Sequence, residues 1–148
     1  MSRSENSSNT KAVLITGGAR RIGAAITRLL HATGMDVIVH YRNSADAALA
    51  LQEELHAHRP GSVTLCQADL TNSGACETLT QCAHQAFGRL DALINNASAF
   101  YPTPVDRATE AEWEDLFAVN LKAPFFLAQA CAPMLAIQSG AIINLADI

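Results

Sequence analysis

A glycine-containing turn between an apolar run and a helical pattern constrains this chain more than any other feature. Residues 16–23 read Thr-Gly-Gly-Ala-Arg-Arg-Ile-Gly, and they follow an apolar run at residues 12–15. Apolar residues then recur at helical spacing, at Ile22, Ala25, Ile26, Leu29 and Leu30. A helix N-terminus presents unpaired N–H groups and a partial positive charge, and glycine lets a phosphate approach the backbone. The segment therefore predicts an anion-binding turn.

Arginine occupies the place in this turn where a dinucleotide-binding fingerprint has its middle glycine. Gly17 and Gly18 allow the tight turn, and Gly23 allows the helix to pack closely on the strand. Arg20 and Arg21 add two guanidinium groups, which suit a phosphate-rich ligand through bidentate hydrogen bonds. The alternatives are an ordinary glycine turn in an α/β protein and a solvated surface pair of arginines.

Strand-like and helix-like segments alternate along the chain. We expect strands at residues 11–15, 36–40, 62–67, 92–95 and 141–145. We expect helices at residues 22–33, 45–57 and 73–87, and a last one that continues past Asn120 to Met134 with an irregularity before Pro124. The alternation predicts an α/β fold with a doubly wound parallel sheet of Rossmann type, of which this chain is the amino-terminal portion with five strands.

Several residues mark where these helices begin and end. Gly34 stops the first helix because glycine can take a positive φ, and Ser44 can cap the second helix. Thr109 with Glu112 three residues later predicts a capping box at the start of the last helix.

The composition excludes several classes of protein. With 49% hydrophobic and 16% charged residues among 148, the chain is typical of a soluble globular protein. The net charge of −4 argues against a nucleic-acid partner, and no apolar run approaches the roughly 20 residues that cross a membrane. Residues 1–10 are polar and lack the apolar centre of a signal peptide, so we expect a disordered tail before a domain at residues 11–148. Four cysteines with no zinc or redox spacing indicate reduced thiols in the cytoplasm and no metal site.

The end of the second strand bears on the choice of cofactor. In NAD-binding domains an acidic residue near this place binds the ribose hydroxyls. Residues 40–44 read His-Tyr-Arg-Asn-Ser and contain no acidic residue. Arg42 and Ser44 can instead bind a 2′-phosphate, which favours NADP over NAD. The alternative is that Arg42 is only a loop charge.

Polar residues also follow the third and fourth strands. Asp69, followed by Leu70, can accept a hydrogen bond from an adenine amino group, or it can cap a loop or helix. Asn95 and Asn96 can satisfy main-chain groups of a turn. Asn120 lies within a helical pattern against its propensity, which is a modest indication of function.

Over almost its whole length the chain resembles the short-chain dehydrogenase/reductase family. The resemblance depends on the turn at residues 16–23, Asp69, residues 95–97 and Asn120. Within the family the chain is most similar to the pteridine reductases, which share the arginine in the turn and the His-Tyr-x-x-Ser-like end of the second strand. The most specific match is Asn-Asn-Ala-Ser-Ala-Phe-Tyr-Pro-Thr-Pro at residues 95–104, where most family members have glycine in place of Ser98.

The resemblance implies roles for these residues around NADPH and a pteridine. The implied cofactor-binding residues are Gly17, Arg20, Arg21, Ile22, Gly23, His40, Tyr41, Arg42, Asn43, Ser44, Asp69, Leu70, Asn96, Ala97 and Ser98. His40, Arg42 and Ser44 would surround the 2′-phosphate. The implied substrate-binding residues are Arg21, Ser98, Phe100 and Asp147, with Phe100 stacked on the pterin ring opposite the nicotinamide.

Two residues have implied catalytic roles. Asn120 would organise a proton-relay water, and Asp147 would orient the catalytic Tyr and help deliver a proton to the ring. An ordinary strand-end aspartate is the alternative for Asp147. The family's Tyr-x-x-x-Lys pair is absent from this sequence, because neither Tyr41 nor Tyr101 is followed four residues later by Lys. We therefore expect the chain to be the first part of a longer protein.

The function that the resemblance implies is NADPH-dependent reduction of a pteridine, such as a dihydropterin or dihydrofolate, by hydride transfer. A homotetramer is expected for the full-length protein. One alternative is a short-chain reductase acting on a 3-oxoacyl or sugar carbonyl, against which Phe100 and Asp147 argue. Another is a truncated, non-catalytic NADP-binding module.

Overall fold

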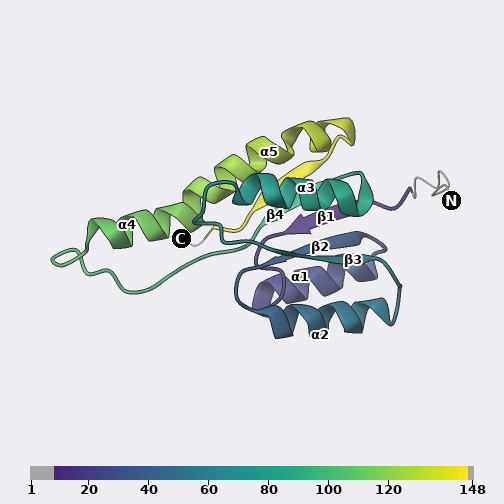
Figure 1. Cartoon of the computed structure of the whole chain (residues 1–148), viewed down its shortest axis with the longest axis horizontal. Helices are drawn as coiled ribbons and strands as arrows, with labels where there is room; N and C mark the ends of the chain where they lie inside the picture. The colour runs from purple at the N-terminus through teal and green to yellow at the C-terminus, as the bar shows by residue number, and fades with distance from the viewer. Residues whose placement is uncertain (1–8, 147–148) are drawn as a thin grey trace.

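The protein is built on a five-stranded parallel sheet with the strand order β3-β2-β1-β4-β5 (Figure 1). The structure, a computed structural model, describes residues 9–146. The strands are β1 (Ala12–Ile15), β2 (Asp36–Tyr41), β3 (Val63–Gln67), β4 (Ala92–Asn95) and β5 (Ala141–Asn144). Every neighbouring pair is parallel; Val13, for example, pairs with Val37 on one side and Ala92 on the other. The predicted α/β fold is confirmed.

Helices connect successive strands and cover both faces of the sheet (Figure 1). They are α1 (Arg21–Ala32), α2 (Ala45–His56), α3 (Ala75–Phe87), α4 (Glu110–Phe117), a π-helical turn η1 (Ala118–Lys122) and α5 (Ala123–Ile137). In Figure 1, α1 and α2 lie on one face, and α3 and α5 lie on the other. No helix of the described chain is long and apolar enough to cross a membrane.

Two apolar cores lie on the two faces because successive side chains of a strand point to opposite sides. Leu14 of β1 belongs to the core beneath α3 and α5, with Leu79 and Leu127. Its neighbour Ile15 belongs to the core beneath α1 and α2, with Leu51. All four residues of β1 are buried, and its continuous apolar run agrees with its central place in the sheet.

The strand order reverses direction at β1, since β2 and β3 lie on one side of it and β4 and β5 on the other. The connections after β1 and β4 therefore leave toward opposite faces and open a crevice at the carboxyl ends of these strands. Ligands of open α/β sheets bind at such a point. The turn at residues 16–20 and the loop at residues 96–109 both begin there.

The predicted element boundaries agree with the structure to within three residues, the largest difference being the end of the last helix at Ile137 instead of Met134, but one predicted cap is absent. Ser44 lies at the N-cap of α2, but its side chain makes no capping hydrogen bond. Its backbone, at φ −94° and ψ 48°, is outside the extended conformation that directs an N-cap side chain back to the helix. The prediction of a Ser44 cap is therefore wrong.

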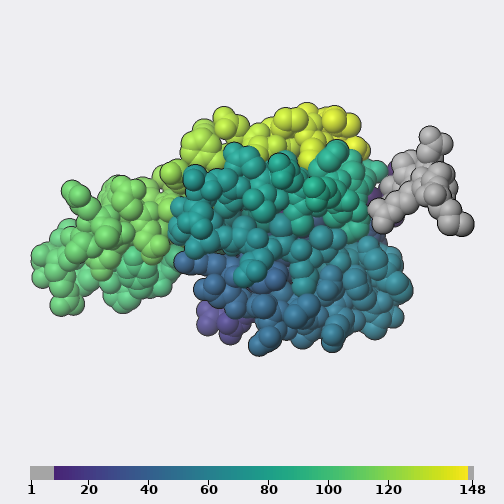
Figure 2. Space-filling view, in the orientation of Figure 1, coloured from purple at the N-terminus to yellow at the C-terminus, as the bar shows by residue number. Residues whose placement is uncertain are grey.

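The predicted irregularity before Pro124 is the turn η1, where the N–H of Ala123 bonds to the carbonyl of Ala118. Proline has no N–H, so the carbonyl of Asn120 loses the donor that an α-helix would supply from Pro124. On the N-terminal side of η1, α4 and the loop before it form a lobe that extends from the body of the molecule (Figure 2). The capping box of Thr109 and Glu112 is confirmed at the start of α4.

Candidate functional site

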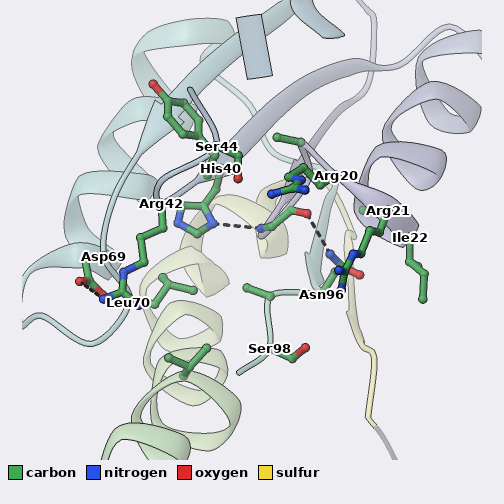
Figure 3. Close-up of a pocket in the computed structure, with 16 residues that line it drawn as sticks. Arg20, Arg21, Ile22, His40, Arg42, Ser44, Asp69, Leu70, Asn96 and Ser98 are labelled. Carbon is green, nitrogen blue, oxygen red and sulfur yellow. Dashed lines mark hydrogen bonds and ion pairs between the residues drawn. The ribbon is translucent and has the colours of Figure 1, made fainter. Parts of the chain in front are cut away.

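A cavity of about 400 Å³ lies at the carboxyl ends of β1, β2 and β4, where the sheet order reverses (Figure 3). It gathers residues from five separate segments of the chain. Of the fifteen residues predicted to contact a cofactor, it contains all except Asn43. The lining residues are Gly17, Ala19, Arg20, Arg21, Ile22, Gly23, His40, Tyr41, Arg42, Ser44, Asp69, Leu70, Asn96, Ala97, Ser98 and Val119. Ala19 and Val119 were not predicted from the sequence, because their apolar side chains carry no chemical signal.

The N-terminus of α1 at this cavity lacks a protein cap. Its first intrahelical hydrogen bond runs from the N–H of Ala24 to the carbonyl of Arg20 at 3.1 Å. The side chain of Arg20, the N-cap residue, makes no capping bond, and the first turn holds no acidic residue. The N–H groups of Arg21, Ile22 and Gly23 are thus left for a ligand, and an anion is the ligand that they favour.

Arg21 adopts a backbone conformation that favours glycine. Its φ is +49°, in the left-handed region that non-glycine residues rarely occupy. A dinucleotide fingerprint has a glycine at this place, so the chain keeps the backbone shape while adding a guanidinium group. Arg20, Arg21 and Arg42 line the cavity with Asp69 as the one carboxylate among its lining residues, which leaves an excess of positive charge.

The turn is held in place from the β4 side by the loop that begins at Asn96. The side-chain amide of Asn96 donates to the carbonyls of Thr16 and Gly17, at 3.0 and 3.1 Å. In return, the Thr16 hydroxyl oxygen accepts hydrogen bonds from the N–H groups of Asn96 and Ala97, both at 3.0 Å. Thr16 therefore joins the two loops, a role that the sequence analysis did not assign.

Gly23 is where α1 approaches the turn most closely. A Cβ atom at this position would lie 2.0 Å from the carbonyl oxygen of Gly17 and 2.7 Å from the side-chain nitrogen of Asn96. Gly23 does allow close packing, as predicted, but the helix packs against the turn at Gly17 and not against the strand.

His40 is turned inward from the cavity wall toward this turn (Figure 3). Its ring accepts a hydrogen bond from the N–H of Gly17 at 3.0 Å, and its other nitrogen lies 3.0 Å from the carbonyl of Ala68. Burial lowers the pKa of His40, although the carbonyl of Ala68 and the charge of Asp69 oppose this effect. Both ring nitrogens are thus occupied by main-chain groups.

Arg42 and Asp69 form an ion pair at the outer end of the cavity (Figure 3), with Nη2 and Oδ2 3.0 Å apart. The other carboxylate oxygen of Asp69 accepts hydrogen bonds from the N–H and hydroxyl of Thr71, at 3.0 and 2.7 Å. The hydrogen bonds from Thr71, and then the charge of Arg42, lower the pKa of Asp69. Asp69 is therefore ionised at neutral pH and orients Arg42 beside the cavity.

A second cavity of about 610 Å³ adjoins the first and shares Ala97 and Ser98 with it. Phe100, which is 88% exposed, lines it together with Phe125 of α5 and Leu145 after β5. This second cavity is largely apolar and open, which suits a flat organic ring. The lining also includes Leu121 and Pro124. Neither these two residues nor Phe125 were assigned to a site from the sequence.

Asn120 holds the loop that carries Phe100. Its side chain accepts a hydrogen bond from the N–H of Ala99 at 3.0 Å and donates one to the Ala99 carbonyl at 2.8 Å. The hydroxyl of Tyr101 donates to the carboxylate of Asp115 in α4, at 3.0 Å. These bonds on both sides of Phe100 fix the loop against α4 and η1.

The remaining predicted residue, Asp147, lies outside the described residues. Within residues 9–146, no group of three or more His, Cys, Asp or Glu side chains could hold a metal ion. The four cysteines are free thiols, of which Cys66 and Cys131 are buried.

Comparison with known proteins identifies the family. A protein-family model described as short chain dehydrogenase matches residues 11–147. The chain belongs to the short-chain dehydrogenase family. The strand order and the cavity at the carboxyl ends of β1 and β4 agree with this assignment, and the resemblance noted from the sequence is confirmed.

Several curated proteins are similar to this chain. Pteridine reductase 1 from Leishmania tarentolae is 36% identical over 154 residues, covering 83% of this chain and 53% of that protein. The 3-oxoacyl-[acyl-carrier-protein] reductase FabG from Staphylococcus aureus (strain Mu50) is 36% identical over 140 residues, covering 94% of this chain and 56% of the relative. The chain thus spans about half the length of the curated relatives that it matches.

A solved structure is also similar to this chain. The crystal structure of FolM alternative dihydrofolate reductase 1 from Brucella suis in complex with NADP superposes with a TM-score of 0.86 at 35% identity. The match covers 93% of this chain and 57% of that one.

Proposed function

We propose that this chain is the cofactor-binding part of an NADPH-dependent reductase that transfers a hydride to a pteridine, such as a dihydropterin or dihydrofolate. The observation that carries the proposal is the left-handed Arg21 at an uncapped helix N-terminus, in a positively charged cavity that adjoins an apolar cavity lined by Phe100. The similarity to a pteridine reductase and to an alternative dihydrofolate reductase supports the substrate class.

The residues of the first cavity fit NADPH. The free N–H groups of Arg21, Ile22 and Gly23 would hold the pyrophosphate, since a helix N-terminus without a cap favours an anion. Arg42 and Ser44 would hold the 2′-phosphate at the outer end of the cavity, where no acidic residue follows β2 directly. Asn96, Ala97 and Ser98 would line the path toward the second cavity. NADPH would supply the hydride.

The second cavity fits a flat heteroaromatic ring. Phe100 would stack on one face of that ring, because offset packing of aromatic faces is favourable. The side chain of Asn120 would fix the position of Phe100 through Ala99. The main-chain carbonyl of Asn120, to which Pro124 has no N–H to donate, would hold a water for proton delivery. Asp147 remains our proposed proton-delivering residue beside the ring.

Turnover by the full-length protein tests the proposal. We expect NADPH absorbance to fall when dihydrobiopterin or dihydrofolate is added, and Phe100→Ala to raise the KM for the pterin about tenfold without changing NADPH affinity. Val105→Ala is the matched control, because Val105 is an apolar, fully exposed residue of the same loop that lines neither cavity. Absence of turnover with every pterin would contradict the substrate class.

The similarity to FabG supports a second candidate, a reductase of a 3-oxoacyl carbonyl, because its identity to this chain equals that of the pteridine reductase. The same Phe100→Ala variant separates the two. Full activity of the variant on a 3-oxoacyl thioester would favour the carbonyl substrate, since no ring would then need Phe100.

We also propose that the full-length protein is a cytoplasmic homotetramer. Large apolar side chains exposed along α4, η1 and α5 support self-association: Trp113, Phe117, Leu121, Phe125 and Phe126. Trp113 and Phe117 stack with their ring centroids 4.0 Å apart. Sedimentation of the full-length protein at fourfold the subunit mass is the expected result.

A further inference from the structure

His40 is one of the residues that line the first cavity, yet neither of its ring nitrogens is available to a ligand. Only 2% of the residue is exposed. One nitrogen, Nδ1, is 3.0 Å from the main-chain nitrogen of Gly17, and the other, Nε2, is 3.0 Å from the carbonyl oxygen of Ala68. The histidine therefore bridges the turn at Gly17 and the loop at Ala68 through its ring, and Figure 3 shows its bond to the turn.

These two contacts fix the protonation state of the ring. A main-chain N–H can only donate, so Nδ1 must accept and carries no proton. A carbonyl can only accept, so Nε2 must donate and carries the proton. The contacts are thus satisfied together by the neutral ring with its proton on Nε2, and by neither the other tautomer nor the charged form.

The two loops that His40 joins belong to opposite ends of the cavity. Gly17, at φ +61°, forms the turn that precedes α1, and Ala68 comes directly before Asp69 at the outer end. The main chain of His40 adds a further bond, from the N–H of Gly18 to the His40 carbonyl at 3.0 Å. Asn96 holds the same turn from the β4 side.

We propose that His40 is a positioning residue of the nucleotide site: its neutral ring fixes the Gly17 turn to the Ala68 loop, and protonation of the ring releases the turn and weakens nucleotide binding. The inference rests on the proposed function, because it takes the ligand of this cavity to be a dinucleotide. His40 acts through Gly17 and Ala68, and makes no contact of its own with the phosphates.

The charges around His40 agree with this arrangement. Asp69 after β3 favours the protonated ring, while Arg42 at the end of β2 pairs with Asp69, and Arg20 and Arg21 at the start of α1 line the same cavity. Burial outweighs the effect of Asp69, so the pKa of His40 lies below its ordinary value. Protonation of Nδ1 would place the ring N–H against the main-chain N–H of Gly17, with no acceptor between the two.

Nuclear magnetic resonance of the 148-residue chain tests the tautomer without any ligand. We expect the ring nitrogen shifts of His40 at pH 7.5 to show a neutral ring protonated at Nε2. We also expect the Gly17 amide resonance to move with the titration of His40 as the pH is lowered. A ring protonated at Nδ1, or a charged ring at pH 7.5, would overturn the inference.

Nucleotide titrations of three variants test the positioning role. His40→Asn keeps an acceptor near Nδ1, His40→Gln keeps a donor near Nε2, and His40→Phe keeps neither. Fluorescence titration with NADPH at pH 7.5 should show a dissociation constant raised no more than about threefold in His40→Asn and about tenfold in His40→Gln. Thermal unfolding of each variant verifies that it is folded, and His31→Asn, a buried histidine remote from the cavity, is the matched control.

The pH profile separates positioning from a merely structural role. Between pH 7.5 and 5.5 the affinity of the unsubstituted chain should fall, and that of His40→Asn should stay nearly constant. Titrations with NADH, which has no 2′-phosphate, exclude titration of the ligand as the cause, since a phosphate titrates near pH 6. Wild-type affinity in His40→Gln, or an unchanged pH profile in His40→Asn, would overturn the inference. Failure of the unsubstituted chain to bind any dinucleotide would overturn the proposed function instead, and the ring tautomer would still be measured.

Discussion

Gly23 is the residue at which the candidate site tolerates the least change. A Cβ atom there would lie 2.0 Å from the carbonyl oxygen of Gly17, so the turn or the helix must move. We expect Gly23→Ala to lower the free energy of unfolding by about 2 kcal/mol, the usual cost of overpacking, and to abolish NADPH binding. Urea unfolding and fluorescence titration measure the two effects.

Gly34→Ala is the matched control for this substitution. Gly34 has a φ of +97° and no atom within 4 Å of its added Cβ, so only backbone strain is introduced. We expect some loss of stability with unchanged NADPH affinity. Equal loss of affinity in the two variants would contradict a steric role for Gly23.

Arg21 adds a positive charge to the turn but holds a strained backbone conformation. Because its φ of +49° favours glycine, Arg21→Gly should raise the free energy of unfolding by about 1 kcal/mol, as measured in urea. The same variant should bind NADPH about tenfold more weakly, because a charge-assisted hydrogen bond to phosphate is lost. Arg21→Asn, which also tolerates this backbone conformation, should lose affinity to the same extent. Unchanged affinity in both variants would exclude Arg21 from the phosphate site.

At the scale of single elements, α4 depends on its capping box. None of its eight residues is buried, so core packing contributes little to this helix. The N–H of Glu112 bonds to the Thr109 hydroxyl at 3.2 Å, and the Glu112 carboxylate accepts from the Thr109 N–H at 2.7 Å. The cap therefore carries much of the stability that α4 has.

Thr109→Ala should weaken α4 locally. Loss of a capping hydroxyl costs about 1 kcal/mol, which corresponds to about fivefold faster amide exchange in residues 110–117. The midpoint of global unfolding should not change, because α4 lies outside both cores. Glu114→Ala is the control, since Glu114 is an exposed residue of the same helix. Equal exchange in the two variants would argue against the capping role.

At the scale of the whole molecule, two buried histidines link stability to pH. Burial, followed by the charge of Arg59, lowers the pKa of His31, and burial lowers that of His40. The unfolded chain therefore binds protons near pH 6.5 that the folded chain does not bind, so stability must fall as the pH decreases through this region.

We expect the free energy of unfolding to decrease between pH 7.5 and 5.5, by at most about 1.4 kcal/mol per pH unit for each histidine. Urea unfolding at a series of pH values measures this decrease. The double variant of His31→Asn with His40→Asn should show a flatter profile. Stability that stays constant or rises toward pH 5.5 in the unsubstituted chain would contradict the linkage.

Within residues 9–146, β5 is an edge strand of the sheet, and its four residues are all exposed. With Ile142, Ile143 and Leu145 accessible, this edge should pair with a second chain, because unpaired N–H and carbonyl groups beside apolar side chains promote association. We expect the 148-residue chain to sediment above its monomer mass and Ile143→Lys to reduce this association. Val105→Lys, at an isolated exposed position, should not. A monomeric chain would contradict the prediction.

The sequence by itself determined the elements and the residues of the turn that follows the first strand. These follow from local rules: the continuous apolar run of β1, the glycines of the turn, the capping box at Thr109, and Pro124, which cannot donate a hydrogen bond. Parallel strands bring their carboxyl ends to one edge, and the residues after β1, β2 and β4, to which the family resemblance gave a common cofactor role, meet there in one cavity.

Only the tertiary structure decided what each polar side chain contacts. His40, Asp69 and Asn120 have the residue types of ligand-binding groups, but their nearest partners are Gly17 and Ala68, Thr71 and Arg42, and Ala99. A hydrogen bond has to be within about 3 Å and well aligned, and no sequence pattern fixes distances between residues that are tens of positions apart. For the same reason the role of Thr16, which is 80 residues from Asn96, became apparent only in the folded chain.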